Sequence, residues 1–518
     1  MINFSDVRRL NEAQPQNVKT GYDRLRLMAS LSPQLVKYVY QMVKTFPFSL
    51  PFSPRTASFP FPAPHPSPAF AHIIRKPHRK INFFPATPIF WHGFCSFIRH
   101  NHKTNWPAVI FVNKIINITN TTRGVGKTMK YDFDQVIDRS ANRAAKYDER
   151  IKKFGTNDVI PLWVADMDFK TAQPIIDALK SKAEEGIWGY TSRPDSYFDA
   201  ICSWQQRRNG WQIDKSLVSW SLGVVPALSA IVKVFTNPGD KVMIQTPVYS
   251  EFYDVTEAWG RVVVENQLVE QGGRWTIDFA DFERKAKEVK VFLLCSPHNP
   301  LGIVWTKEQL KKMADICIAN NVLLVSDEIH SDLIFHGKKH IPTATVSKEI
   351  AGKVISCISG TKTFNLAGLQ ASTTVFPDLE TKERFDRFWT NMDIHRNNAF
   401  SSVAMEAAFN EGEEWLEQLL IYLDGNFEYV RSFCEKRIPQ IKVNVPDATY
   451  LMWLDCRGLN MDNETLRTFM IEKAGLGLNE GYTFGRSLSG YMRLNAACPR
   501  SILEQAMKQL KEAVDANT

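Results

Sequence analysis

Short apolar runs rich in β-branched side chains recur through the middle of the chain, each bounded by polar residues or turn formers. Runs of this length and composition are typical of strands that are buried on both faces of a sheet. We therefore predict strands over 241–245, 261–265, 289–295, 322–326 and 353–358.

Helical patterns separate some of these runs. Residues 278–288 and 306–321 carry apolar side chains three and four positions apart, and the second segment begins with Thr306-Lys-Glu-Gln309, the pattern of a capping box. Alternating strands and helices predict an α/β fold, in which helices cover a mostly parallel sheet. Ligands bind such sheets at the carboxyl ends of the strands.

The first 128 residues differ from the rest. They hold 14 of the 27 prolines, and residues 46–70 carry proline too often for a helix or a central strand. We expect a disordered tail or an extension from an upstream start site, ahead of globular composition from Met129. Two alternatives stay open, a basic DNA-binding arm and a membrane or export signal over 81–98, although prolines interrupt that stretch.

The charge is divided in the same way. Residues 1–128 contain 17 Lys and Arg against 3 Asp and Glu, a net charge of +14. Because the whole chain has a net charge of +8, residues 129–518 have a net charge of −6. The basic balance therefore says nothing about the partners of the last 390 residues. Eight cysteines without a CxxC pair or regular spacing predict reduced thiols in a cytoplasmic protein, with no disulfide framework and no metal site.

Three chemically distinct side chains follow the ends of predicted strands. Asp327 lies after 322–326, Asn299 after 289–295 and Lys362 after 353–358, so an acid, an amide and an amine converge on one sheet edge. Taken singly, each has a structural explanation as a loop cap, a turn residue or a solvated lysine. Together, with hydroxyl residues flanking Lys362, they are what a Schiff-base lysine beside a phosphate cup requires.

These motifs resemble a known family. HNPLG, SDEIH and SGTKTFNLAGL, in this order and spacing, resemble the fold-type I pyridoxal-phosphate enzymes of the class I and II aminotransferase superfamily. Further stretches narrow the resemblance to the cystathionine β-lyase, or C–S lyase, branch of the MalY/PatB type; they are WVADMDF, WGYTSRPDSY, GVVPALSAIV, TPVYSEFY and YMRLNAACPR. The resemblance covers Met129 to the C-terminus and implies a mostly parallel seven-stranded sheet in a large domain, with a smaller α/β domain.

The resemblance implies a role for each cofactor-binding position. Lys362 forms the bond to pyridoxal 5'-phosphate, Asp327 pairs with the ring nitrogen, and Asn299 binds the phenolic oxygen. His330 either contacts the same oxygen or packs against the residues that contact it, and this choice stays open. The remaining positions implied to hold the ring or the phosphate are Tyr249, Gly223, Val224, Ser359, Thr361 and, from a neighbouring subunit, Tyr190.

Substrate binding follows from the same resemblance. Arg493 is implied to grip the α-carboxylate of an amino acid, with Asn365 and Tyr190 beside it, and Tyr190 implies a homodimer. Two positions depart from the wider family: Gln370 replaces a phosphate-binding arginine, which fits the lyase branch, and Ala448 replaces glycine.

The implied organisation divides the chain beyond the first segment into three parts. Residues 129–175 are the N-terminal part of the small domain, 176–415 the large cofactor-binding domain, and 416–518 the C-terminal small domain. The implied function is a C–S β-lyase that yields a thiol, pyruvate and ammonia. An aminotransferase, or a cofactor-sensing regulator with a basic DNA-binding arm, are the alternatives.

Overall fold

The computed structural model describes residues 130–271 and 273–517. The predictions for residues 1–128 lie outside this range. Within it, a seven-stranded sheet has the strand order β2-β10-β9-β8-β7-β3-β4, and all its strands are parallel except β10. Its strands are β2 (Val218–Ser221), β3 (Lys241–Ile244), β4 (Val262–Glu265), β7 (Val291–Cys295), β8 (Leu323–Asp327), β9 (Val354–Ile358) and β10 (Ser372–Val375).

The sheet is buried on both faces because alternate residues of its strands enter two separate cores. On β7, Leu293 packs with helices on one face while Phe292 and Leu294 pack with helices on the other. The first group of helices is α10 (Val224–Phe235), α11 (Glu251–Glu257) and α15 (Leu379–Asn391). The second is α12 (Phe279–Ala286), α13 (Lys307–Ala319) and α14 (Lys348–Ala351).

The predicted elements in this region are confirmed. All five predicted strands form, within two residues of their expected bounds, and both predicted helices form as α12 and α13. The capping box of α13 is also present: the Thr306 hydroxyl accepts a hydrogen bond from the Gln309 amide, and the Gln309 side chain accepts one from the Thr306 amide. The expected α/β class and seven-stranded sheet are therefore correct.

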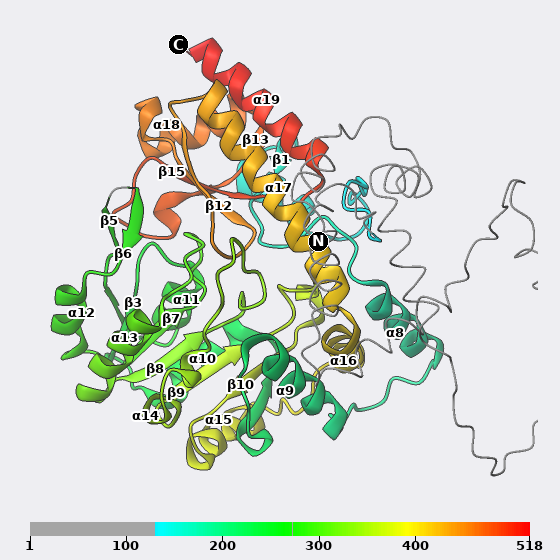
Figure 1. The fold of residues 1–518 in the computed structure, drawn as a ribbon, viewed down its shortest axis with the longest axis vertical. Helices are drawn as coiled ribbons and strands as arrows, with labels where there is room; N and C mark the ends of the chain where they lie inside the picture. Colours follow the sequence, from blue (N-terminus) through cyan, green and yellow to red (C-terminus); the bar gives the residue numbers. More distant parts are fainter. Residues whose placement is uncertain (1–129, 272, 518) are drawn as a thin grey trace, which may run out of the picture. The chain divides into compact units, whose positions relative to one another are not determined.

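A second, four-stranded antiparallel sheet has the order β11-β12-β15-β14. Figure 1 shows it above the large sheet, flanked by two long helices. The elements of this region are β11 (Lys442–Asn444), β12 (Leu451–Asp455), β14 (Asn479–Glu480), β15 (Tyr491–Asn495), α17 (Glu413–Arg437), α18 (Asn463–Thr468) and α19 (Arg500–Asn517).

The beginning of the described chain joins this second sheet region. Strand β1 (Ile160–Pro161) pairs in parallel with β13 (Leu476–Gly477), more than 300 residues later in the sequence. The remaining elements are α6 (Ala145–Asp148), α7 (Arg150–Phe154), α8 (Gln173–Glu184), α9 (Asp195–Asn209), α16 (Ser401–Glu411) and the hairpin of β5 (Val269–Gln271) and β6 (Arg274–Thr276).

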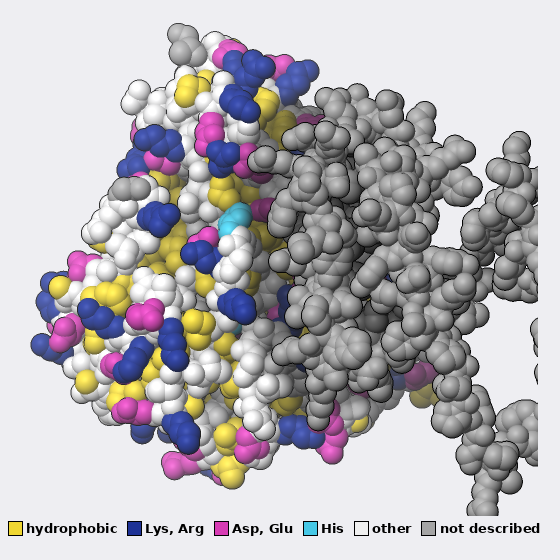
Figure 2. Space-filling view, in the orientation of Figure 1, with side chains coloured by type: hydrophobic (Ala, Val, Ile, Leu, Met, Phe, Trp, Pro, Cys, Tyr) yellow, Lys and Arg dark blue, Asp and Glu magenta, His cyan; other side chains and the backbone are white. Residues whose placement is uncertain are grey.

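The surface of the described residues mixes both signs of charge. On the face shown in Figure 2, basic and acidic side chains are interspersed rather than gathered into one patch. Among the described helices, none combines the length and the apolar character that crossing a bilayer requires. The seven cysteines within the described residues are all free thiols.

Candidate functional site

The carboxyl ends of the parallel strands bring the predicted residues to one edge of the large sheet. Asp327 is the last residue of β8, and it lies in register with Cys295 at the end of β7 and with Cys357 on β9. Asn299 and Lys362 follow β7 and β9 within four residues of the strand ends. Convergence of an acid, an amide and an amine was therefore correctly predicted from the sequence.

Asp327 is a buried carboxylate without a cationic partner. Its Oδ1 accepts a hydrogen bond from the Ile329 amide at 3.1 Å. Within the described part of the chain, no Lys, Arg or His lies at ion-pair distance from it. Burial raises its pKa to about 7, and the neighbouring Glu328 adds to this, while the Ile329 amide and Lys362 act in the opposite direction. A cationic ligand at Asp327 would therefore meet an unpaired negative group.

Lys362 lies in the loop after β9, and its amine has one hydrogen bond, donated from Nζ to the carbonyl oxygen of Ala165 at 2.6 Å. Burial and the nearby Arg493 guanidinium lower its pKa to about 8, and the carboxylates of Asp166 and Asp327 oppose this shift. About half of the amine is therefore neutral at pH 8, and the neutral amine is the form that attacks an aldehyde or accepts a proton.

Hydroxyl groups and a helix terminus lie beside this lysine. The hydroxyls of Ser359 and Thr361 are 2.8 Å apart, and the Thr361 amide donates to the Ser359 hydroxyl. Helix α10 starts at Val224 after Gly223, as expected, and no side chain caps its first turn. Its first amides are therefore free to bind an anion, and the helix dipole favours negative charge there.

Arg493, on β15, is a buried guanidinium whose partners in the described chain are all neutral. It donates to Asn299 Oδ1 at 3.2 Å, to Asn479 Oδ1 at 2.9 Å and to the carbonyl oxygen of Trp163 at 2.7 Å. Its Nε has no hydrogen-bond partner, and the group lies 4.7 Å from the centre of the Phe484 ring. Burial lowers its pKa to about 10, so it stays charged and lacks a counterion.

Two further predicted residues lie near these groups. His330 is buried, and its Nδ1 has no hydrogen-bond partner among the residues that the structure describes. Burial and the positive charges of Lys362 and Arg493 lower its pKa to about 3, so this imidazole is neutral. Tyr249 follows β3 and is half-buried; burial raises the pKa of its phenol.

Tyr190 and Asn365 are placed differently from the residues above. Tyr190 is 96% exposed, and the guanidinium of Arg396 lies 5.4 Å from its ring centre. The side chain of Asn365 accepts from the Met167 amide and donates to the carbonyl oxygens of Met167 and Phe169. Asn365 therefore connects the loop that carries Lys362 to residues 167–169, and these hydrogen bonds of its side chain are all made within the chain.

The two departures from the family pattern differ in backbone conformation. Ala448 is fully buried and does not have a positive φ, so an alanine is accommodated there. Gln370 adopts a left-handed conformation with φ of 53° after the short helix that follows Lys362.

Several groups in this region were missed from the sequence. The Ala165 carbonyl accepts from both Lys362 and the Tyr450 hydroxyl, the latter at 2.7 Å, and the Trp163 carbonyl accepts from Arg493. Every residue has a backbone carbonyl, so the sequence does not indicate which carbonyls accept hydrogen bonds in the site. Tyr450 lies in a buried, strand-like stretch, where an aromatic side chain predicts only core packing. Its place in the site becomes visible in the structure, where its ring lies opposite His330 with ring centres 6.1 Å apart.

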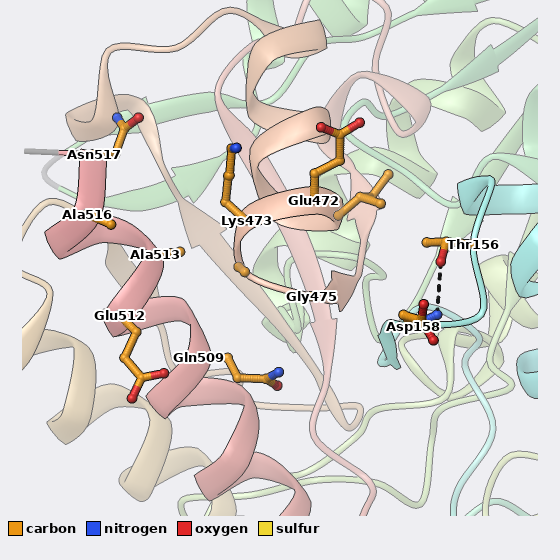
Figure 3. Close-up of a pocket in the computed structure, with 12 residues that line it drawn as sticks. Thr156, Asp158, Glu472, Lys473, Gly475, Gln509, Glu512, Ala513, Ala516 and Asn517 are labelled. Carbon is orange, nitrogen blue, oxygen red and sulfur yellow. Dashed lines mark hydrogen bonds between the residues drawn. The ribbon is translucent and has the colours of Figure 1, made fainter.

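A cavity of about 740 Å³ lies elsewhere, between α19, residues 471–475 and Thr156 and Asp158 (Figure 3). None of the predicted site residues lines it. The charged groups around it, among them Lys473 and Glu512, come from the second sheet region (Figure 3). The chemically reactive side chains at the edge of the large sheet therefore define a separate site.

Comparison with known proteins agrees with this geometry. Residues 157–510 match the family described as aminotransferase class I and II. The chain is 39% identical to cystathionine beta-lyase PatB of Bacillus subtilis over 385 residues, which cover 74% of this chain and all of that protein.

Solved structures show the same relationship. A PLP-bound putative aminotransferase from Clostridium difficile is 47% identical with a TM-score of 0.73, covering 74% of this chain and 100% of the other. Cystalysin from Treponema denticola, which contains pyridoxal 5'-phosphate, is 35% identical with a TM-score of 0.73, covering 75% and 100%. Because the family match spans more than half of its length, this chain belongs to the aminotransferase class I and II family.

Proposed function

We propose that this protein is a pyridoxal-phosphate-dependent C–S β-lyase, which converts cystathionine or a related cysteine S-conjugate and water to a thiol, pyruvate and ammonia. The observation that carries the proposal is a set of three buried groups without an ion-pair partner in the described chain. The Lys362 amine, whose pKa is lowered, and the Asp327 carboxylate lie at the carboxyl ends of the large sheet's strands, and the Arg493 guanidinium reaches this edge from β15 through its hydrogen bond to Asn299. Relatives named cystathionine beta-lyase or C–S lyase support the choice of reaction.

The residues present fit pyridoxal phosphate. Asp327, buried without a cation, would hold the protonated ring nitrogen, and the uncapped start of α10 with Ser359 and Thr361 would hold the phosphate. Asn299 would bind the phenolic oxygen, Tyr249 would cover the ring, and His330 would lie behind them with a neutral imidazole. When bound, the cofactor supplies an aldehyde for the amino group and an electron-withdrawing ring for the Cα electrons.

The chain's own residues then provide binding and proton transfer. Arg493 would hold the substrate α-carboxylate through charged hydrogen bonds, because its Nε is unpaired and no carboxylate of the described chain neutralises it. The neutral amine of Lys362 would take the Cα proton. The Cβ–S bond then breaks, the thiolate leaves with the bonding electrons, and water releases ammonia and pyruvate.

We further propose a homodimer, in which the exposed Tyr190 reaches the phosphate site of the partner subunit. Its exposure of 96% supports contact with a second copy. The free thiols of the described cysteines support a cytoplasmic location. The β1–β13 pairing supports assigning 129–175 to the small domain together with 416–518, and 176–415 to the large domain.

The decisive experiment measures pyruvate release from cystathionine, cystine and S-methylcysteine side by side, with thiol release followed in the same samples. We expect equal amounts of thiol and pyruvate from at least one of them, with no requirement for a 2-oxo acid. Turnover that requires a 2-oxo acid and leaves the C–S bond intact would instead make the protein an aminotransferase.

The pH dependence of cofactor capture tests the state of Lys362. Only the neutral amine attacks the aldehyde, and the pKa of about 8 makes half of it neutral at that pH rather than near 10.5. The rate at which cofactor-free protein binds pyridoxal phosphate, followed by visible absorbance, should rise from pH 7 to about 8 and then level off. A rate that keeps rising through pH 10 would show an ordinary solvated lysine.

Substitution of Arg493 tests the carboxylate site. Arg493→Ala should raise KM for amino-acid substrates, because a hydrogen bond to a charged group contributes about 1.5 to 3 kcal/mol, or roughly 10- to 150-fold in binding. The cofactor should be retained. Arg486→Ala, which removes a surface arginine paired with Glu257, is the matched control and should leave KM unchanged. A normal KM in Arg493→Ala would place the carboxylate elsewhere.

A further inference from the structure

A cluster of four charged residues, Arg139, Lys146, Asp166 and Asp168, lies next to the site and has no role in the proposed chemistry. The Lys146 amine lies 2.8 Å from Asp168 Oδ2 and 3.5 Å from Asp166 Oδ1. Arg139 lies 2.5 Å from Asp168 Oδ1 and 3.2 Å from Asp166 Oδ2. Each cation therefore bridges both carboxylates, and the two positive and two negative charges balance.

Burying these four charged residues costs free energy unless every charge keeps its partner. Lys146 is fully buried on the short helix α6, where a lysine is rarely found without a partner. Burial lowers its pKa, but Asp168 and Asp166 more than offset this, so that the pKa is raised and the amine stays charged. Loss of one member would leave an uncompensated charge in the interior.

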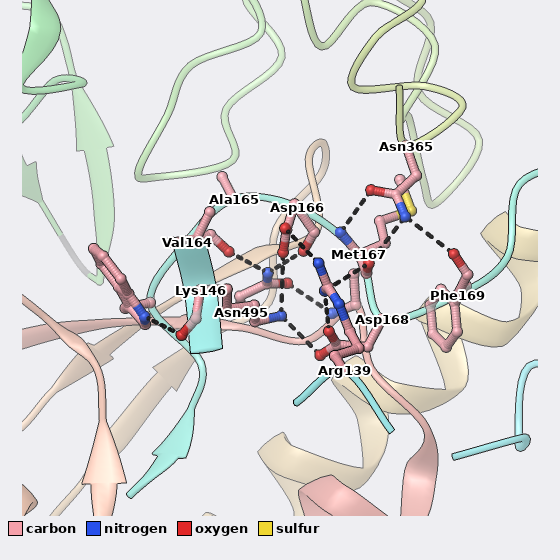
Figure 4. Close-up of polar contacts among 12 residues, drawn as sticks. Arg139, Lys146, Val164, Ala165, Asp166, Met167, Asp168, Phe169, Asn365 and Asn495 are labelled. Atoms are coloured by element: carbon pink, nitrogen blue, oxygen red, sulfur yellow. Dashed lines mark hydrogen bonds and ion pairs between the residues drawn. The ribbon is translucent and has the colours of Figure 1, made fainter. Parts of the chain in front are cut away.

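Both aspartates belong to residues 163–169 (Figure 4), and two backbone carbonyls of this segment accept hydrogen bonds from functional side chains. The carbonyl of Trp163 accepts from Arg493, and that of Ala165 accepts from Lys362. Asn495 donates to the carbonyls of Val164 and Asp166, at 2.7 and 2.6 Å. Residues 163–169 therefore contact both Arg493, the proposed carboxylate-binding residue, and Lys362, the proposed base.

The segment has only a two-residue strand to hold it, since β1 ends at Pro161. Beyond that point the segment makes one backbone hydrogen bond, from the Asp168 amide to the Ala497 carbonyl. The other contacts that hold it come from side chains: the charged cluster, Asn495, and Asn365, whose amide spans Met167 and Phe169 (Figure 4). Of these, only the charged cluster anchors it to residues outside the two sheets and their loops, through Arg139 and the helix that carries Lys146.

We propose that Arg139 and Lys146 are positioning residues for the reaction: by clamping Asp166 and Asp168, they fix the backbone of 163–169 and thereby the geometry of both Lys362 and Arg493. The inference rests on the proposed function. It makes Arg139 and the helix that carries Lys146, both before β1, part of the support of the active site.

The test uses Arg139→Gln, at the partly exposed border of the cluster, and Lys146→Met, which keeps the length of the buried side chain without its charge. Asp281→Asn is the matched control. It also removes a carboxylate that pairs with two cations, Arg284 and Lys285, but on α12, far from 163–169 in the sequence and in a different core. Each variant is assayed as the holoenzyme well below its own unfolding temperature.

Both cluster variants should keep bound cofactor with its visible band. Because misplacing a catalytic group by about 1 Å can cost on the order of 100-fold, we expect kcat/KM to fall roughly 10- to 100-fold, shared between a higher KM and a lower kcat. In the cofactor-free protein, amide hydrogen exchange in 163–169 should accelerate in the cluster variants and stay unchanged in Asp281→Asn.

A lower unfolding temperature with unchanged kcat, KM and exchange in 163–169 would overturn the proposal, because it would give the cluster a purely structural role. If Lys146→Met does not fold, Arg139→Gln decides alone. Failure of the proposed function would be distinguishable, because the unmodified enzyme would then release no thiol and pyruvate.

Discussion

Replacing Lys362 by alanine is expected to remove nearly all turnover and the visible absorbance of lysine-bound cofactor. The lysine would be both the attachment point and the base that takes the Cα proton, and loss of a general base alone costs about 10²- to 10⁴-fold in rate. No other lysine of the described chain is placed at the carboxyl end of the sheet with a lowered pKa. The measurement is steady-state kinetics with an absorbance spectrum after borohydride treatment and dialysis.

Lys353→Ala is the control for this change. Lys353 is exposed and lies immediately before β9, the strand whose other end leads to Lys362, so the control alters the same strand without touching the site. It should keep both spectrum and activity. A Lys362→Ala protein that retains the spectrum of the unmodified enzyme would place the cofactor bond on another residue.

Asp327→Asn should depress kcat strongly while leaving substrate binding less affected. The change keeps the size of the side chain but removes the charge that would pair with the ring nitrogen, and breaking a buried ion pair costs about 3 to 5 kcal/mol, or roughly 10²- to 10⁴-fold. Because Asp327 contacts no substrate in the proposed arrangement, the loss should appear in kcat, whereas Arg493→Ala acts on KM. An Asp327→Asn enzyme with normal kcat would contradict the proposed pairing.

The same substitution should stabilise the cofactor-free protein. A carboxyl whose pKa is raised from 3.8 to about 7 on folding binds its proton more tightly in the folded state, so its contribution to stability declines as pH rises through this range. At pH 8 the buried Asp327 carboxylate is charged and unpaired, and an asparagine avoids that cost. Thermal unfolding of both cofactor-free proteins at pH 5 and pH 8 should show the gain at pH 8. A lower unfolding temperature for the variant at pH 8 would refute this explanation.

The parts of the fold that sequence reasoning anticipated are those with a continuous apolar signal. Strands β3, β7, β8 and β9 are buried on both faces, so most of their residues are apolar and form short runs. Strands β2 (VSWS) and β10 (STTV) are also in the sheet, but their serine and threonine side chains give no such run, and they were not predicted. The antiparallel direction of β10 has no signal in the residue pattern.

The site follows a similar division. Asp327, Asn299 and Lys362 could be brought together from the sequence because each follows a recognisable strand. Lys146 could not be recognised as buried, since a lysine beside polar residues predicts a solvated side chain, and only the fold supplies the two carboxylates that compensate it. Carbonyl oxygens such as that of Ala165 are present at every residue and become distinctive only in three dimensions.

The pairing of β1 with β13 constrains how the protein matures on the ribosome. Ile160 aligns with Leu476, Leu162 donates its amide to Gly477, and Asn495 holds Val164, so an early segment obtains its partners only after almost all of the chain has been synthesised. Contacts so distant in sequence form slowly and late in folding. Nascent chains that stop before residue 476 contain all seven strands of the large sheet, yet they lack both the partner strand of β1 and the arginine at 493. Catalytic competence should therefore arise only after release of the completed polypeptide, independently of how early the large sheet forms.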